Sequence, residues 1–214
     1  MLTEKELAIF KNVSKYANKH RWMSYMYQFK EVLNEEYETI LIIGVGDGVV
    51  PLLIQYCIKQ QNLKTQIITF DKEKDLNPDI VGDIRDIKQL TQQYKIDCIL
   101  CCEVLEHIEF EYVEQILKDM SEVTKIAIIS LPHSKRSLFK LSLKIPRIKE
   151  INIDLMIPKK FRPNKYHHWE LGSWGKCVSI KKIESIITKS FYVIRKYNVP
   201  EIKYHLFYVL RSMK

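Results

Sequence analysis

The chain of 214 residues has few glycines, no long apolar segment and no repeated or low-complexity stretch. It contains no apolar run of the roughly 18 residues that a membrane-spanning helix requires, which excludes a helical membrane span. The polar N-terminal residues lack the apolar segment of a secretory signal peptide, so we expect a cytoplasmic protein. The length and the ordinary apolar share of 46% predict a single domain over residues 1–214.

Cysteines are scarce and poorly spaced for a metal site or a disulfide framework. Of the five, Cys98 and Cys101 form a C-x-x-C pair. A structural zinc site needs a second pair at a defined spacing, and the sequence has none. Because Cys98, Cys101 and Cys102 lie in an apolar run, we interpret them as small buried hydrophobes and expect no metal.

Three of the six glycines fall within five residues, directly after an apolar run. The run Ile40–Ile43 predicts a buried strand, and Gly44, Gly46 and Gly48 predict a tight turn that leads into a helix. Glycines permit positive φ angles and close approach to a ligand, and the helix N-terminus behind them presents free N–H groups. In α/β sheets this arrangement binds nucleotide-like cofactors. Val49 stands where a dinucleotide site has its third glycine, which argues against a nicotinamide dehydrogenase.

Acidic side chains stand at the ends of three further predicted strands. They are Asp71 after strand 65–70, Asp83 after strand 79–81 and Glu103 after strand 96–102. An acid at such a strand end can accept hydrogen bonds from a ribose diol. For Asp71 the alternative interpretation is a solvated turn.

This order of elements, with Glu103-Val-Leu-Glu-His107 after the fourth strand, resembles the class I S-adenosylmethionine-dependent methyltransferases. It is most similar to their small-molecule branch in ubiquinone and menaquinone biosynthesis, and the similarity covers roughly residues 38–131. The resemblance implies S-adenosylmethionine as the cofactor and methyl transfer to a small metabolite. It also implies a Rossmann-like α/β fold with seven mostly parallel strands, an antiparallel final strand and helices on both faces.

The resemblance further implies roles for the loop residues and for one arginine. The loop that would surround the methionine part of the cofactor consists of Gly44, Val45, Gly46, Asp47 and Gly48. Arg21 is a candidate partner for the methionine carboxylate, since a guanidinium suits planar anions. An ordinary surface arginine is the alternative for Arg21.

The remaining cofactor contacts follow from the same resemblance. Asp71, with Lys72 beside it, would bind both ribose hydroxyls. Asp83 would accept a hydrogen bond from the adenine amino group, with Ile84 beside the ring. Glu103 would lie next to the methionine moiety.

One position departs from the family pattern. The family usually has an acidic residue two positions before the first glycine, and here that residue is Ile42. The acid normally braces the glycine loop and the cofactor's ammonium group. Its absence keeps open a third interpretation, a non-catalytic protein that retained the fold.

Periodicity and composition divide the chain into four parts. These are an N-terminal helical cover (1–36), a cofactor-binding core (37–131), a basic substrate cap (132–172) and a C-terminal helix with a β-hairpin (173–214). Helices are predicted at 3–34 with a break near 18–21, 49–61, 85–94, 109–122 and 180–189. Strands are predicted at 39–43, 65–70, 79–81, 96–102, 125–131, 191–199 and 202–210.

The cap carries the charge of the whole chain. Residues 134–165 contain ten basic and two acidic residues, which equals the net charge of +8. Within the cap only Leu138–Leu143 shows a helical period, whereas Ile151–Leu155 alternates like a strand. Because the cap follows the fifth strand, it lies at the edge of the sheet where ligands bind. Its field can attract anionic ligands or a membrane surface, and a solvated lysine-rich face is the alternative.

Three histidines are candidate catalytic bases. Methyl transfer mainly requires positioning of the nucleophile, and a base helps when the acceptor is a hydroxyl. His107 follows the fourth strand, His133 follows the fifth, and His168 lies at the end of the cap. His167 and His168 are adjacent, so in an extended segment only one of them faces the pocket.

Two other roles remain open for the residues around His107. Glu103, Glu106 and His107 offer divalent-metal ligands, as the equivalent cluster does in some quinone-biosynthesis O-methyltransferases. Alternatively, Glu106 and His107 form hydrogen bonds that hold the loop.

The methyl acceptor also has alternatives. The basic cap favours a phosphate- or carboxylate-bearing metabolite, while the net charge also fits a nucleic acid, and RNA in particular. Against a base-modifying enzyme, no Asn-Pro-Pro-Tyr element follows the fourth strand. The oligomeric state is left open.

Overall fold

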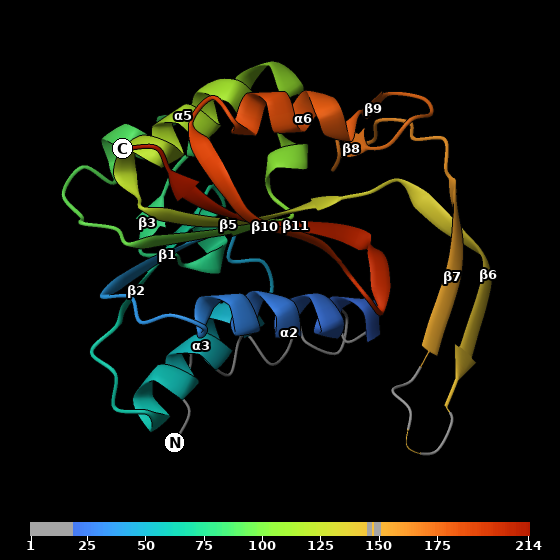
Figure 1. Ribbon diagram of the computed structural model, residues 1–214. Helices are drawn as coiled ribbons and strands as arrows, with labels where there is room; N and C mark the ends of the chain where they lie inside the picture. Colours follow the sequence, from blue (N-terminus) through green and yellow to red (C-terminus); the bar gives the residue numbers. More distant parts are fainter. Residues whose placement is uncertain (1–18, 145–146, 148–150) are drawn as a thin grey trace.

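The computed structural model describes residues 19–144, 147 and 151–214, arranged around a central sheet (Figure 1). The strands of this sheet are β1 (Thr39–Ile43), β2 (Gln66–Asp71), β3 (Ile80–Val81), β4 (Cys98–Cys102), β5 (Ile126–Pro132), β10 (Phe191–Val199) and β11 (Ile202–Ser212). Their order is β10-β11-β5-β4-β1-β2-β3. β11 runs antiparallel to both of its neighbours, and the other pairs are parallel. The predicted seven-stranded Rossmann-like sheet with an antiparallel final strand is confirmed.

Helices cover both faces of the sheet (Figure 1). One face carries α2 (Lys19–Val32) and α3 (Val49–Gln60), and the other carries α4 (Ile87–Leu90), α5 (Val113–Val123) and α6 (Ile180–Ile187). Because both faces are covered, the parallel strands read as continuous apolar runs.

The central strand β1 shows how these residues fill the core. Ile40 and Ile42 pack with Ile54 of α3, while Leu41 and Ile43 pack on the opposite side of the sheet. Ile42 is 2% exposed. The departure from the usual acid therefore places an aliphatic side chain in a closed core.

Of the three cysteines predicted to be buried, two are, and Cys102 is half-buried. All five thiols are free, and Cys98 and Cys101 are buried on β4. Burial raises the pKa of both thiols.

Helix α4 is shorter than the predicted helix at 85–94. A 3₁₀ turn (Ile84–Asp86) precedes it, and the helix ends at Leu90. The Thr91 hydroxyl donates to the Ile87 carbonyl at 2.7 Å, and the Tyr94 N–H then donates to the Thr91 carbonyl at 2.9 Å. This side-chain bond and the tighter turn replace further helical hydrogen bonds.

The helical period at Leu138–Leu143 is wrong as a prediction. These residues belong to β6 (Lys135–Leu143), which pairs in antiparallel orientation with β7 (Ile151–Pro158). The apolar residues at 139, 141 and 143 follow a period of two, and the match at 138 and 141 comes from a bulge between Ser137 and Phe139. A window of six residues fits both a helical and a strand period, and the pairing with β7 shows that the strand period is the correct one.

The β6–β7 hairpin forms a sheet of its own and stands at one side of the molecule, away from the central sheet (Figure 1). Two short strands, β8 (Glu170–Leu171) and β9 (Cys177–Val178), follow it. An isolated bridge between His133 and Leu171 ties this region to the end of β5.

The N-terminal part of the predicted helix at 3–34 lies outside the described residues, and α2 is the part that the structure describes. Within the described ranges, no helix is long and apolar enough to cross a membrane.

Candidate functional site

The glycine loop after β1 has a backbone that requires glycine. The φ angles of Gly44, Gly46 and Gly48 are 83°, 57° and 77°, in the left-handed region that disfavours other residues. A Cβ atom on Gly44 would lie 2.5 Å from Cγ2 of Val104, whereas one on Gly46 would meet nothing within 4 Å. The loop therefore packs against the segment after β4 on one side and is open at Gly46.

Asp71 braces this loop from the end of β2. One carboxylate oxygen accepts the Val45 N–H at 2.8 Å, and the other accepts the Glu73 N–H at 3.0 Å. Each carboxylate oxygen has a second acceptor position, so the same group could also receive a ribose hydroxyl. The neighbouring Lys72 lies on the surface, with its ammonium 4.0 Å from Glu73.

Asp83 is engaged by a residue that sequence reasoning missed. The Arg85 guanidinium donates to both of its oxygens, at 2.9 and 2.7 Å, and this pairing lowers the pKa of the Asp83 carboxyl. Ile84 is 5% exposed and packs in the core with Phe70. If Asp83 accepts a hydrogen bond from an adenine amino group, it must do so with lone pairs that Arg85 does not already occupy.

Helix α2 is tied to the glycine loop through Asp47. The Tyr25 hydroxyl donates to Asp47 Oδ2 at 2.5 Å, and Asp47 Oδ1 accepts the Val49 N–H at 3.2 Å. The Arg21 guanidinium lies 3.9 Å from the same carboxylate. Arg21 is thus next to the loop with its charge facing Asp47, and its contact with a cofactor carboxylate stays a prediction. Tyr25, which the periodicity alone could not single out, completes this contact.

Glu103 directly follows β4 and has a strained backbone conformation. Its φ of 55° is unusual for a residue with a side chain. The Ser130 hydroxyl donates to Glu103 Oε1 at 2.9 Å, and His205 Nδ1 lies 3.5 Å from that oxygen. Two neighbouring strands, β5 and β11, therefore fix the direction of this carboxylate.

Glu106 is the least satisfied polar side chain of the site. It is 0% exposed, and neither carboxylate oxygen has a hydrogen-bond partner among the described residues. Burial, and then the charge of Glu103, raises the pKa of the Glu106 carboxyl well above its usual range. A buried carboxylate without a partner is costly to ionise, and a bound cation would lower that cost.

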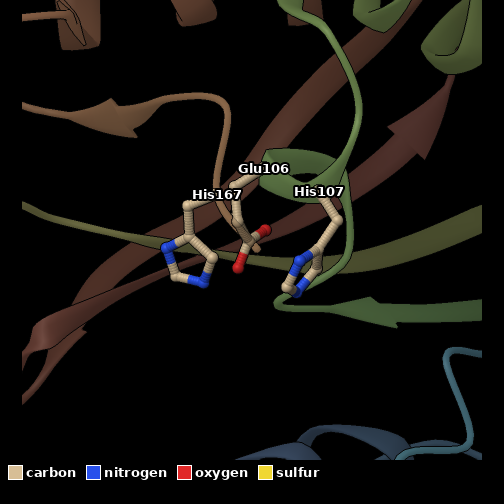
Figure 2. Close-up of side chains that lie close together, drawn as sticks. All are labelled: Glu106, His107 and His167. Atoms are coloured by element: carbon tan, nitrogen blue, oxygen red, sulfur yellow. The ribbon is translucent and has the colours of Figure 1, made fainter. Parts of the chain in front are cut away.

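Two imidazoles face Glu106, as Figure 2 shows. One ligand atom each from Glu106, His107 and His167 lies within 4.8 Å of the other two. The two imidazole rings are 5.0 Å apart in an edge-on arrangement. One carboxylate and two imidazoles match the donors that divalent transition metals prefer. These three residues fit a metal ion better than they fit a closed hydrogen-bond network.

Second contacts orient both histidines. The Nδ1 atom of His107 contacts the Tyr166 carbonyl oxygen, and His167 Nδ1 lies 2.9 Å from Glu170. Glu170 also accepts the Tyr204 hydroxyl at 2.9 Å. Such outer partners hold the ring that faces a metal and fix its tautomer, which leaves Nε2 of each ring for the site.

The structure reverses the choice between the two adjacent histidines. His168 was our candidate base, but its side chain is exposed and its N–H donates to the Glu106 carbonyl at 2.8 Å. His167 is the one that faces the cluster. The segment before β8 is irregular, so strand alternation could not decide which of them points inward.

His133 lies buried at the end of β5, outside the three-residue cluster. Burial, with Lys135 and Lys196 nearby, lowers the pKa of its imidazole to about 4. At neutral pH the ring is therefore uncharged and only weakly basic. Its Nδ1 atom has no hydrogen-bond partner in the described part of the chain.

No protein-family model matches this chain, and no curated protein matches its sequence. Solved structures do match it. The small RNA methyltransferase HEN1 has a TM-score of 0.59 at 16% identity, covering 91% of this chain and 25% of HEN1. The glycopeptide N-methyltransferase MtfA, solved with S-adenosylhomocysteine, has a TM-score of 0.57 at 7% identity, covering 92% and 91%.

TehB from Haemophilus influenzae is a third neighbour, with a TM-score of 0.53 at 14% identity, covering 94% of this chain and 65% of TehB. Of HEN1, in contrast, this chain spans only a quarter of the length. At these identities the likeness establishes the fold, which is that of the class I methyltransferases. It does not select the quinone-biosynthesis branch.

Proposed function

We propose that this protein transfers a methyl group from S-adenosylmethionine to a hydroxyl oxygen of an anionic acceptor, with a divalent metal ion holding that hydroxyl. The observation that carries the proposal is the buried carboxylate of Glu106, which lacks a hydrogen-bond partner and converges with His107 and His167. The same short segment begins at Glu103, directly beside the glycine loop. A candidate metal site and a cofactor loop that both lie against residues 103–107 favour O-methylation.

Cofactor binding is supported by the way the glycine loop is held. Asp71 binds the Val45 N–H, and Asp47 joins Tyr25 to the start of α3. These contacts brace the loop from two sides, which is the work that an acid in place of Ile42 would do. We therefore favour a functional cofactor site over a protein that only kept the fold.

The chain's own residues supply the ligands and their orientation. Glu106 provides the negative charge, and His107 and His167 provide neutral nitrogen donors. Glu170 holds the His167 ring from behind at 2.9 Å. A divalent ion held by these residues would supply Lewis-acid chemistry, which lowers the pKa of a hydroxyl toward neutral pH. In the transfer the acceptor hydroxyl would give its proton to solvent and its oxygen would form the bond to the methyl carbon in line. The carbon–sulfur bond would break, and the cofactor would leave as the neutral thioether.

The charge of the cap supports an anionic acceptor. His167 joins the cluster from a segment that directly follows the basic residues of 134–165. A positive field beside the site raises the local concentration of anions. We propose a phosphate- or carboxylate-bearing metabolite as the acceptor.

An RNA end is the second candidate acceptor. The charge near the site fits a polyanion, and the neighbour HEN1 is described as a small RNA methyltransferase. A ribose hydroxyl is also a ligand that a divalent ion can hold. Transfer of labelled methyl groups to RNA, with a steep loss of activity as salt rises, would select RNA over the metabolite.

The metal site is tested by titrating the protein with Mn²⁺ and following the loss of the free-ion electron paramagnetic resonance signal. We expect wild type to bind one ion per chain, and Glu106→Gln to weaken binding by about 100-fold. Glu111→Gln, four positions beyond His107 on an exposed turn, is the matched control and should bind like wild type. Equal Mn²⁺ binding by wild type and Glu106→Gln would refute the metal site.

A further inference from the structure

The β6–β7 hairpin exposes large apolar side chains. Leu138, Phe139, Leu141, Leu143, Ile153 and Leu155 are between 37% and 62% exposed. Folded proteins rarely leave such a set in water unless the patch contacts something. No comparable set occurs on the exposed face of α5, where the large side chains point into the core.

The strand register gathers five of these residues, all except Leu138, on one face. Phe139 pairs with Leu155 and Leu141 with Ile153, and cross-strand partners share a face. Leu143 falls on the same face because side chains two residues apart point the same way. The opposite face carries the pair Lys140 and Asp154. The hairpin therefore has one apolar face and one polar face.

Basic residues flank the apolar face. Arg136 of β6 pairs with Ile157, two residues beyond Leu155, while Lys144 follows β6 and Lys159 and Lys160 follow β7; all four basic residues are exposed. In Figure 1 the hairpin projects beyond the body of the protein. An apolar patch flanked by basic residues has the chemistry of an interface that meets fatty chains and anionic headgroups together.

Other occupants fit less well. Single-stranded nucleic acid is bound by aromatic side chains that stack on bases, and only Phe139 of the six exposed side chains is aromatic. A second copy of the chain would bring two such basic hairpins together, and their like charges repel. The charge of the hairpin complements an anionic bilayer.

We propose that the hairpin docks this protein on an anionic lipid bilayer, with Phe139, Leu141, Leu143, Ile153 and Leu155 entering the boundary between headgroups and acyl chains. Arg136 and Lys144 then extend their stems along the lipid and keep their charged groups at the phosphates. The glycine loop and the cluster of Glu106, His107 and His167 remain in water on the body of the protein. The proposal concerns a different surface from that cluster, although its basic residues are among those that the acceptor proposal invokes.

The test is co-sedimentation with vesicles, using phosphatidylcholine alone and phosphatidylcholine mixed equally with phosphatidylglycerol. We expect wild type to bind the mixed vesicles, and to bind them less as salt rises. The double variant Leu141→Ser/Ile153→Ser should lower the partition coefficient at least about tenfold, because two buried aliphatic side chains are lost. Arg136→Glu/Lys144→Glu should lower it about as much.

Matched controls lie on α3. Tyr56→Ser removes a side chain that is 60% exposed, and Lys59→Glu reverses an exposed charge. Both should bind the mixed vesicles like wild type. Far-ultraviolet circular dichroism and thermal melting confirm that each variant folds, so a lost partition is not a lost fold.

Three results would overturn the proposal. Folded wild type could stay in the supernatant with the mixed vesicles, or both hairpin variants could bind as well as wild type. Alternatively, the apolar variant could abolish self-association or RNA binding in a wild type that ignores vesicles, which would assign the face to another partner.

Discussion

The glycine loop follows β1 and the β6–β7 hairpin follows β5, two strands separated by β4, and the two regions are held in opposite ways. Asp71, at the end of β2, holds the loop by accepting the Val45 N–H. Tyr25 of α2 holds it by donating to Asp47, which belongs to the loop itself. The hairpin hydrogen-bonds mainly to itself, and its apolar face lies in solvent. A braced loop can hold a cofactor in one geometry, whereas a free hairpin is available to an external partner. Substitutions in the two regions should therefore have different consequences.

Gly44→Ala should have the largest effect of the four changes considered. Left-handed φ strain and the 2.5 Å approach to Val104 together should reduce the free energy of unfolding by about 3 to 4 kcal/mol. Gly46→Ala shares the positive φ but meets no atom within 4 Å, so it should cost only about 1 kcal/mol. Urea denaturation measures both, and equal losses would show that Val104 does not constrain the loop.

His133, at the end of β5 where the chain enters the hairpin, should make the stability of the fold depend on pH. Burial lowers the pKa of this imidazole to about 4, whereas the unfolded chain has about 6.5, so the unfolded state binds more protons between these values. The contribution of His133 to the free energy of unfolding is thus complete above pH 6.5. About 2 to 3 kcal/mol of it is lost as the pH drops toward 4.

His133→Gln should remove that part of the acid destabilisation, while the exposed His20→Gln should leave it in place. Denaturant titrations across the pH range measure the difference. An unchanged slope in His133→Gln would mean that another group causes the loss.

Asp71→Ala should affect the cofactor more than the fold. Removing the carboxylate deletes the brace to the Val45 N–H and the candidate ribose acceptor. We expect the affinity for S-adenosylhomocysteine to fall at least tenfold, which is about 1.4 kcal/mol. Asp75→Ala, on the next turn, is the control in calorimetry, and a similar loss there would remove Asp71 from the site.

The smallest effect should come from the hairpin. Leu141→Ser/Ile153→Ser changes exposed side chains, so stability should stay within about 0.5 kcal/mol of wild type. Affinity for S-adenosylhomocysteine should not change, because the hairpin is held apart from the glycine loop. A large loss of either quantity would show that the two regions are coupled and would remove the contrast between them.

The same contrast separates what the sequence predicted from what it could not. The buried strands at 39–43 and 125–131 and the glycine turn were predicted because their apolar runs and spacing are local signals, and the structure has them at Thr39–Ile43 and Ile126–Pro132. The strand at 135–143 was missed because a bulge disturbs its alternation and gives a short helical period.

Within the site, sequence order placed Glu103, Glu106 and His107 together because they share one segment. His167 comes from about 60 residues away, and only the tertiary fold brings it to them. Arg85 lies two residues after Asp83, but that spacing alone does not show that the two side chains pair. Tyr25 contacts Asp47 from another element of the fold. A residue that acts through a distant partner carries no signal in its own neighbourhood.

Calorimetric titration of the wild type with S-adenosylhomocysteine, with NADH as the control ligand, tests the central claim most directly. The account predicts micromolar binding of S-adenosylhomocysteine and none of NADH, because the loop is braced without an acid at position 42 and lacks the third glycine of a dinucleotide site. If folded wild type bound neither ligand, the cofactor site and the proposed methyl transfer would both be contradicted.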